Sequence, residues 1–174
     1  MPDLQTWATS PREITKDDNL AFESPVLQAA AETWFVLAEG QIPPRSRFTA
    51  RTVKGFVGHL IIFEKLTAEN YLIRLMGTRV TNILGEMQGK TLTEALPAET
   101  AGRWCAALND LLAARRPMRL VTTLNFNDLH YLEAEIFLAP LTDDAGKETK
   151  ALAAVVFRQG LSKKTSVADL IGKS

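Results

Sequence analysis

The chain contains little cysteine, little histidine and no excess of charge of one sign, and each shortage excludes a class of protein. Cys105 is the single cysteine in 174 residues, so neither an intramolecular disulfide nor a cysteine-rich metal site can form. The 20 basic and 20 acidic residues cancel, which leaves no broad positive field to hold nucleic acid or an anionic membrane. A small local basic patch remains compatible with this balance.

Long apolar runs are missing as well. No stretch approaches the roughly 18 consecutive apolar residues that cross a bilayer as a helix. Residues 1–5 lack the basic start and the apolar run of a secretory signal. We therefore expect a cytoplasmic protein that contacts no membrane.

The composition that is present is that of an ordinary globular protein, with 46% apolar and 23% charged residues. The length favours one domain. Residues 1–23 are mostly polar and show no sustained period, so we expect a partly flexible N-terminal segment. The domain is expected over residues 24–159, and residues 160–174 form a mostly polar C-terminal tail.

A first helix is predicted between Ser24 and Gly40, with Ser24 as its cap and Pro25 at its first position. Its apolar face is wide for a helix with one neighbour. The face comprises Leu27, Ala30, Ala31, Trp34, Phe35, Leu37 and Ala38. The candidate interface is therefore Leu27, Trp34 and Phe35, in contact with a second copy or a protein partner. The alternative is that the helix folds back on its own domain and leaves only Phe35 outside.

The rest of the chain predicts strands on either side of a helical middle. A hairpin is expected from residues 60–66 and 71–76, and short helices follow. A longer helix after Pro97 carries Trp104 in the centre of its apolar stripe, so we expect Trp104 to be buried. Three antiparallel strands then follow, at residues 118–126, 130–139 and 151–158. Together these elements predict a two-layer α+β domain, a five-stranded antiparallel sheet with helices on one face.

This order of elements resembles the PAS fold, and the chain is similar to the stand-alone PAS domain family of bacteria, of the alphaproteobacterial type. The resemblance covers roughly residues 27–158 and rests on the order and spacing of short pieces. The pieces are Trp34, Leu37 and Gly40; Pro43-Pro44-Arg45; Tyr71 to Thr78; Gly85; Gly89 to Leu92; Pro117; Glu135; and Pro140-Leu141. In one departure, Thr49-Ala50 stands near the place where family members often have Asp-Pro, which leaves the local turn open.

The resemblance implies signal sensing and protein–protein interaction in bacterial regulation, often as a homodimer formed through a helix that flanks the sheet. It names no ligand. Flavin-binding relatives place a reactive cysteine in an Asn-Cys-Arg segment, which this chain lacks, and haem-binding relatives use a histidine in the helical middle, where none occurs between Thr78 and Arg116. We therefore expect neither cofactor.

One segment is similar to a phosphate-binding loop. A P-loop has four residues between its first glycine and its Gly-Lys-Thr, whereas Gly85 and Gly89 enclose three. A helix is also expected before Gly85, where a P-loop has a strand. We interpret the segment as two backbone turns around a short helix.

Candidate catalytic groups are few and scattered. His59 and His130 have no carboxylate or nucleophile at a useful local spacing. Glu133 and Glu135 share one face of a strand; we expect this to be the solvent face, with an ion pair from Glu135 to an arginine such as Arg74. Cys105 lies in an apolar stripe, where a thiol titrates high and is a poor nucleophile. No metal site is expected.

The space between sheet and helices is the candidate ligand pocket. Its expected wall positions are Ile73, Leu75, Leu92, Trp104, Leu108, Phe126 and Ile136. These side chains either fill the core completely or leave a small apolar cavity for a ligand, and the sequence leaves both open.

The sequence thus favours a stand-alone sensory or adaptor domain that is not an enzyme. The enzyme alternative is a small α+β lyase or isomerase with His130 or a glutamate as base. Such folds begin with long helices, whereas here two strands precede the central helices. A DNA-binding regulator ranks third, because the chain lacks a basic face and helix–turn–helix spacing.

Overall fold

The computed structural model describes residues 15–17, 19–127 and 130–160. Its centre is one antiparallel sheet in the order β1-β4-β5-β6-β2-β3. Five strands match the predicted ones, and their bounds are β2 Leu60–Thr67, β3 Asn70–Met76, β4 Met118–Asn127, β5 His130–Leu141 and β6 Lys150–Gly160. The sixth, β1 (Thr15–Asp17), pairs with the edge of β4 and lies in the segment where no element was expected.

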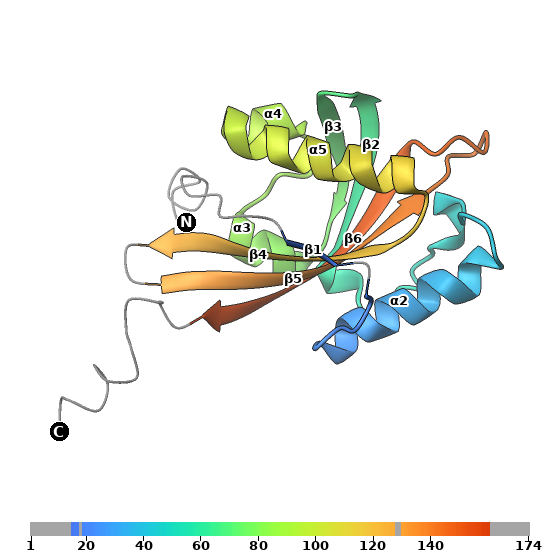
Figure 1. The fold of residues 1–174 in the computed structure, drawn as a ribbon, viewed down its shortest axis with the longest axis horizontal. Helices are drawn as coiled ribbons and strands as arrows, with labels where there is room; N and C mark the ends of the chain where they lie inside the picture. The colour runs from blue at the N-terminus through green and yellow to red at the C-terminus, as the bar shows by residue number, and fades with distance from the viewer. Residues whose placement is uncertain (1–14, 18, 128–129, 161–174) are drawn as a thin grey trace.

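Helices cover both faces of the sheet (Figure 1). One face carries α3 (Thr78–Leu84), α4 (Leu92–Ala95) and α5 (Ala98–Ala114), and the other carries α2 (Pro25–Ala38). The α+β fold is as predicted, and α2 is the flanking helix. No helix in the described ranges is long and apolar enough to cross a membrane.

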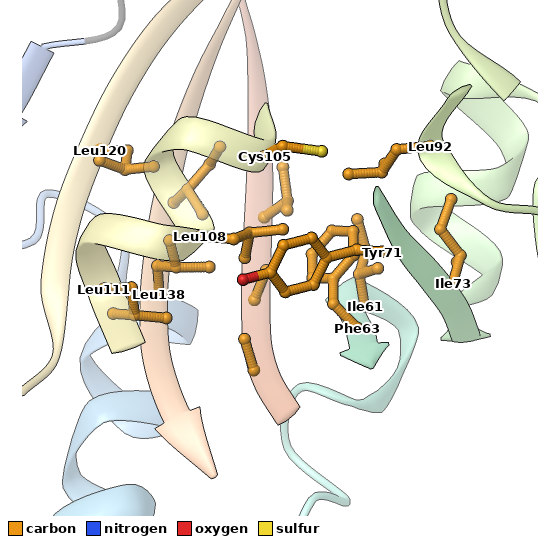
Figure 2. Packing of buried hydrophobic residues seen from close by; sticks show 14 of the residues in the cluster. Ile61, Phe63, Tyr71, Ile73, Leu92, Cys105, Leu108, Leu111, Leu120 and Leu138 are labelled. Atoms are coloured by element: carbon orange, nitrogen blue, oxygen red, sulfur yellow. The ribbon is translucent and has the colours of Figure 1, made fainter. Parts of the chain in front are cut away.

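The two faces have separate hydrophobic cores because side chains alternate along each strand. On β5, Ala134, Ile136 and Leu138 pack toward α5, whereas Phe137 and Ala139 pack toward α2. Figure 2 shows the first of these cores, in which Leu108 and Leu111 of α5 pack with side chains of the central strands. Because β5 and β6 are central strands with both faces covered, the run from Ala151 to Val155 is buried throughout.

The segment that follows α3 protects the outer edge of β3. The N–H of Gly89 donates to the carbonyl of Ile73 (2.8 Å), and the N–H of Ile73 donates to the carbonyl of Lys90 (2.9 Å). The side-chain oxygen of Gln88 accepts from the N–H of Met76 (3.0 Å). An exposed strand edge invites pairing with other chains, so Gly85 to Thr91 has a structural role. A helix precedes Gly85, as expected for a segment that is not a P-loop.

Candidate functional site

A small apolar cavity of about 50 Å³ lies between the sheet and helices α3 to α5. Three of the predicted wall residues line it: Ile73, Leu92 and Trp104. The remaining walls come from side chains that sequence reasoning did not single out, namely Ile61, Phe63, Met76, Leu84, Met87, Leu96, Ala153 and Val155. Typical small-molecule sites measure about 300–1,000 Å³, so this cavity has room for a few apolar atoms.

Two other predicted wall residues, Leu108 and Ile136, belong to the same core but are packed away from the cavity. The side chain of Phe126, in β4, lies outside the described residues. Trp104 packs against this core between helix and sheet but is only partly buried, so the expected burial is incomplete. Its side chain lines the cavity and is partly exposed to solvent.

Leu75 was placed wrongly, and the reason is a β-bulge. Ile73 pairs with Phe63, but Leu75 pairs with the adjacent residue Ile62, so Arg74 has no partner across the pair. An extra residue in one strand shifts the alternation of side chains by one position. Ile73 therefore faces the cavity, whereas Leu75 faces α2.

Polar contacts attach α5 to the turn between β2 and β3. The Tyr71 hydroxyl donates to Asn109 Oδ1 (2.8 Å), and Asn109 Nδ2 donates to the carbonyl of Ala68 (2.7 Å). The Cys105 thiol donates to the carbonyl of Glu69 (3.3 Å). Burial, together with Cys105, raises the pKa of Tyr71 to about 12. Burial, with a contribution from Glu69, also raises the pKa of Cys105, which keeps the thiol protonated at neutral pH.

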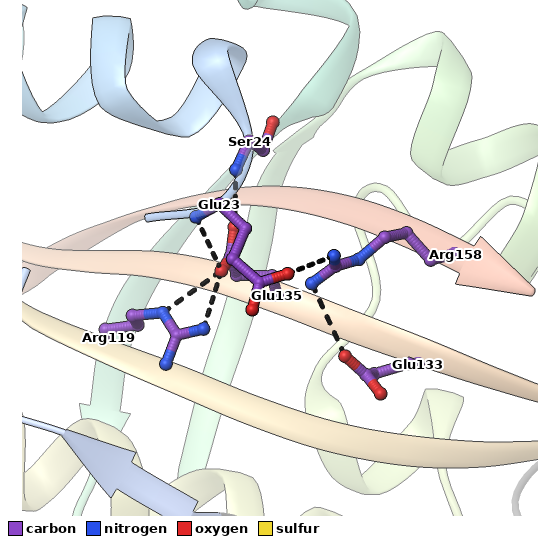
Figure 3. A network of polar contacts seen from close by, with 6 residues as sticks. All are labelled: Glu23, Ser24, Arg119, Glu133, Glu135 and Arg158. Carbon is purple, nitrogen blue, oxygen red and sulfur yellow. Dashed lines mark hydrogen bonds and ion pairs between the residues drawn. The ribbon is translucent and has the colours of Figure 1, made fainter. Parts of the chain in front are cut away.

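The most buried charge in the described residues is Glu135, whose side chain has 0% exposure on the face of β5 that α2 covers (Figure 3). Its Oε2 accepts from Arg119 Nη2 (2.7 Å) and Nε (3.1 Å). The backbone N–H groups of Glu23 and Ser24 donate to its two carboxylate oxygens, each at 3.1 Å. Glu135 therefore caps the start of α2 from a distant strand, and the Ser24 side chain makes no capping bond.

These contacts settle the ionisation of Glu135. Burial alone raises the pKa of a carboxylate. The hydrogen bond from Arg119 and those from the backbone of Glu23 and Ser24 outweigh it, and the pKa of Glu135 lies below its usual range. The expectation of a solvent-facing Glu135 paired with Arg74 is wrong on both points. Arg74 instead pairs with Glu64 on the neighbouring strand.

The other candidate bases make structural contacts. His59 Nδ1 lies 3.0 Å from the carbonyl of Val155, and Glu133 pairs with Arg158. Arg158 also pairs with Glu23, which attaches β6 to the start of α2 (Figure 3). The His130 side chain lies outside the described residues. Within the described part of the chain, no three His, Cys, Asp or Glu side chains gather as a metal ion would require.

Helix α2 buries most of its apolar face on its own sheet. Leu27 and Trp34 lie in the second core, and Trp34 Nε1 donates to the carbonyl of Pro140 (3.0 Å). These two residues therefore contact their own domain, contrary to their assignment as interface residues. Phe35 and Val36 are on the surface, with 51% and 74% exposure. A groove of about 590 Å³ beside Phe35 is bounded by Ile42, Thr142 and the Arg115–Glu148 ion pair.

The family model for the PAS domain matches residues 22–156. The chain belongs to the PAS domain family. PAS domains are sensory modules, and this match confirms the PAS domain family expected from the order and spacing of the short motifs, whereas the bacterial, alphaproteobacterial type stays a prediction.

A solved structure described as "Flavin Analogue Sheds Light on Light-Oxygen-Voltage Domain Mechanism" is similar to this PAS domain over 74% of the present chain and 96% of the other. The two are 14% identical, and the TM-score is 0.45. A likeness at this level carries no argument about function. A search of curated proteins finds no match.

Proposed function

We propose that this PAS domain is a sensory or adaptor module that acts through protein–protein contact made by the outward surface of α2. The observation that carries the proposal is the exposure of Phe35 and Val36 on a helix that is otherwise anchored to the sheet. The groove beside Phe35 adds concave surface to this apolar pair. Exposed apolar patches of this kind mark interaction sites.

The favoured contact is with a second copy, because a two-fold pair buries the same patch on both subunits. Phe35→Glu tests it. The substitution should convert a dimer into a monomer in analytical ultracentrifugation at tens of micromolar, with unchanged circular dichroism, because Phe35 contributes little to the core.

Leu66→Glu is the matched control, since Leu66 has the same 51% exposure but lies on β2, away from α2. It should leave the dimer intact. If the wild-type protein is monomeric at this concentration, self-association is contradicted. The next test is then whether the same surface of α2 binds a different protein.

The cavity between sheet and helices is the proposed place for an input signal. At about 50 Å³ it fits a very small apolar ligand, and Trp104 and Met87 are among its walls. Native mass spectrometry of freshly purified protein measures any bound mass directly. A bound molecule of several hundred daltons would show that the cavity opens much further than its walls indicate.

We infer that the domain is not catalytic. The support is that three of the groups considered for acid–base or nucleophilic chemistry are engaged within the described residues: Glu135 by Arg119, His59 by a backbone carbonyl, and Cys105 as a protonated thiol with a raised pKa.

A further inference from the structure

Two stretches of this electrically neutral chain contain no acidic residue. Residues 41–63 carry Arg45, Arg47, Arg51 and Lys54 but no aspartate or glutamate, and residues 70–85 carry two arginines and no acid. The fold brings the stretches together where α3 packs on the short 3-10 helix at Val57–His59. There, Cγ of Arg79 lies 3.4 Å from the position that a Cβ would occupy on Gly58.

Between Thr49 and His59, the backbone of the first acid-free stretch turns some side chains inward and others outward. The N–H of Val53 bonds to the carbonyl of Thr49, four residues back, whereas Phe56 bonds to Val53 and His59 to Phe56, three residues back. From Val53 to His59 the path therefore has a three-residue repeat. Val53 and Phe56 face inward into the core under α2. The outward positions with the same spacing are Arg51, Lys54 and Val57, all exposed, and Val57 has 48% exposure.

Arg51, Lys54, Val57 and Arg79 form what we call the basic row. Within the described part of the chain, its three cations make no hydrogen bond or ion pair. The neighbouring arginines differ: Arg45 donates to the carbonyl of Phe48, and Arg47 pairs with Glu39. Among the residues that the structure describes, the cations of the row have no carboxylate partner, and neither acid-free stretch supplies one.

A concentration of unpaired like charge opposes the compact state unless something else compensates for it. We propose that the basic row binds an acidic segment of a partner protein, in which carboxylates flank an apolar side chain that covers Val57. The proposal rests on the adaptor function above and gives it a partner of defined chemistry. The basic row contains neither Phe35 nor Val36. An experiment can therefore contradict the proposed contact at α2 without contradicting the proposed contact at the basic row, and the reverse also holds.

The charge pattern argues against other occupants. A second copy that docks row to row would oppose like charges, which costs affinity. Nucleic-acid binders neutralise many phosphates, of the order of 6–10, whereas the row has three cations around an exposed valine. A membrane surface would need a cluster of about 4–8 basic residues or an amphipathic helix.

The test uses the full chain and a set of fluorescein-labelled 12-residue peptides in which one leucine is flanked by four glutamates at varied spacing. Fluorescence anisotropy at low salt should show binding for at least one peptide. Arg51→Glu with Lys54→Glu should weaken that binding at least tenfold. Val57→Ser should weaken it several-fold, and 0.5 M NaCl should weaken it strongly because exposed charges are screened.

The matched control is Lys90→Glu with Arg103→Glu, which makes the same change in net charge on the edge of β3 and on α5. It should change the affinity less than twofold, and so should Phe35→Glu. Equal losses in the two double variants would show a non-specific charge effect and overturn the proposal.

Two further results would also overturn it. One is no binding of any peptide up to about 1 mM, a concentration that corresponds to roughly −4 kcal/mol. The other is tighter binding of duplex RNA or of phosphatidylserine vesicles through the same residues. Circular dichroism of each variant confirms that a loss of binding is not a loss of fold.

Discussion

The two faces of the sheet hold their helices by different means. On the face toward α5, the contact is mainly apolar and leaves a cavity beside Trp104. On the face toward α2, polar bonds from β5 act near both ends of the helix: Glu135 accepts from the backbone at its start, and Pro140 accepts from Trp34 nearer its end. Apolar contact is non-directional, whereas hydrogen bonds fix position. Helix α5 also has hydrogen bonds, from Asn109 and Cys105 to the turn between β2 and β3, so the two faces differ chiefly in the buried charge of Glu135 under α2 and the apolar cavity under α5.

The largest expected effect comes from removing the Glu135 carboxylate, which we call the anchor of α2. Glu135→Ala removes the buried carboxylate to which Arg119 donates and leaves the N–H groups of Glu23 and Ser24 without this acceptor. Breaking a buried pair in this way costs about 3–5 kcal/mol, measured by urea denaturation. Hydrogen exchange should accelerate in α2 more than in α5. Glu133→Ala is the control and should cost less than about 1 kcal/mol, because its ion pair is exposed. Equal losses of unfolding free energy in the two variants would contradict the role of Glu135 in holding α2.

The next effect is on the opposite face. Trp104→Ala removes a half-buried ring at the edge of the cavity, so we expect a loss of about 2 kcal/mol, below the 3–5 kcal/mol typical of a fully buried tryptophan. Urea denaturation measures it. A loss as large as that of Glu135→Ala would show that the apolar face is as tightly fixed as the face with the charged anchor.

A third change lies where the two faces meet. A Cβ on Gly77, which follows β3, would lie 2.4 Å from the carbonyl oxygen of Gly58. Gly77→Ala therefore forces β3 and the 3-10 helix apart, and overpacking of this kind costs about 1–3 kcal/mol. Gly55→Ala is the control, because nothing lies within 4 Å of its Cβ position. A Gly77→Ala protein as stable as the control would show that the backbone at Gly77 and Gly58 can separate without loss of stability.

The smallest effect is a dependence on pH. The pKa of Glu135 in the folded state lies below the ordinary glutamate value of about 4.3, so the unfolded chain takes up this proton first as the pH falls. The contribution of Glu135 to stability is therefore complete above about pH 4.3 and is lost as the pH falls from there through the folded-state pKa. The difference in unfolding free energy between wild type and Glu135→Gln should shrink over that window. If that difference stays constant with pH, the proposal that Glu135 stabilises the fold as an ionised carboxylate is contradicted.

Much of the fold could be predicted from local patterns. Runs rich in strand-forming residues and separated by turn residues indicated β2 to β6. Pro25 with Gly40 indicated the limits of α2, which ends at a left-handed Glu39 (φ 51°) and Gly40 (φ 82°). Three pocket residues were also found, because strand and helix periodicity shows which side chains face inward.

The errors arose where a distant partner decides a residue's role. Glu135 alternates with apolar residues as a solvent-facing carboxylate does, and nothing near it in sequence shows that Arg119 and the start of α2 will cover it. Leu75 follows a regular alternation, and only the pairing with β2 shows that Arg74 is an extra residue.

By itself, the sequence determined the order of the elements, the PAS family and the apolar stripes, because these depend on residue types at fixed spacing along the chain. It also contained the acid-free stretches at residues 41–63 and 70–85. Tertiary structure alone decided which face α2 covers, how Glu135 is neutralised and that Arg79 lies beside Gly58, next to the exposed Val57. The physical reason is that burial and ion pairing depend on distances across the fold, which spacing along the chain does not specify.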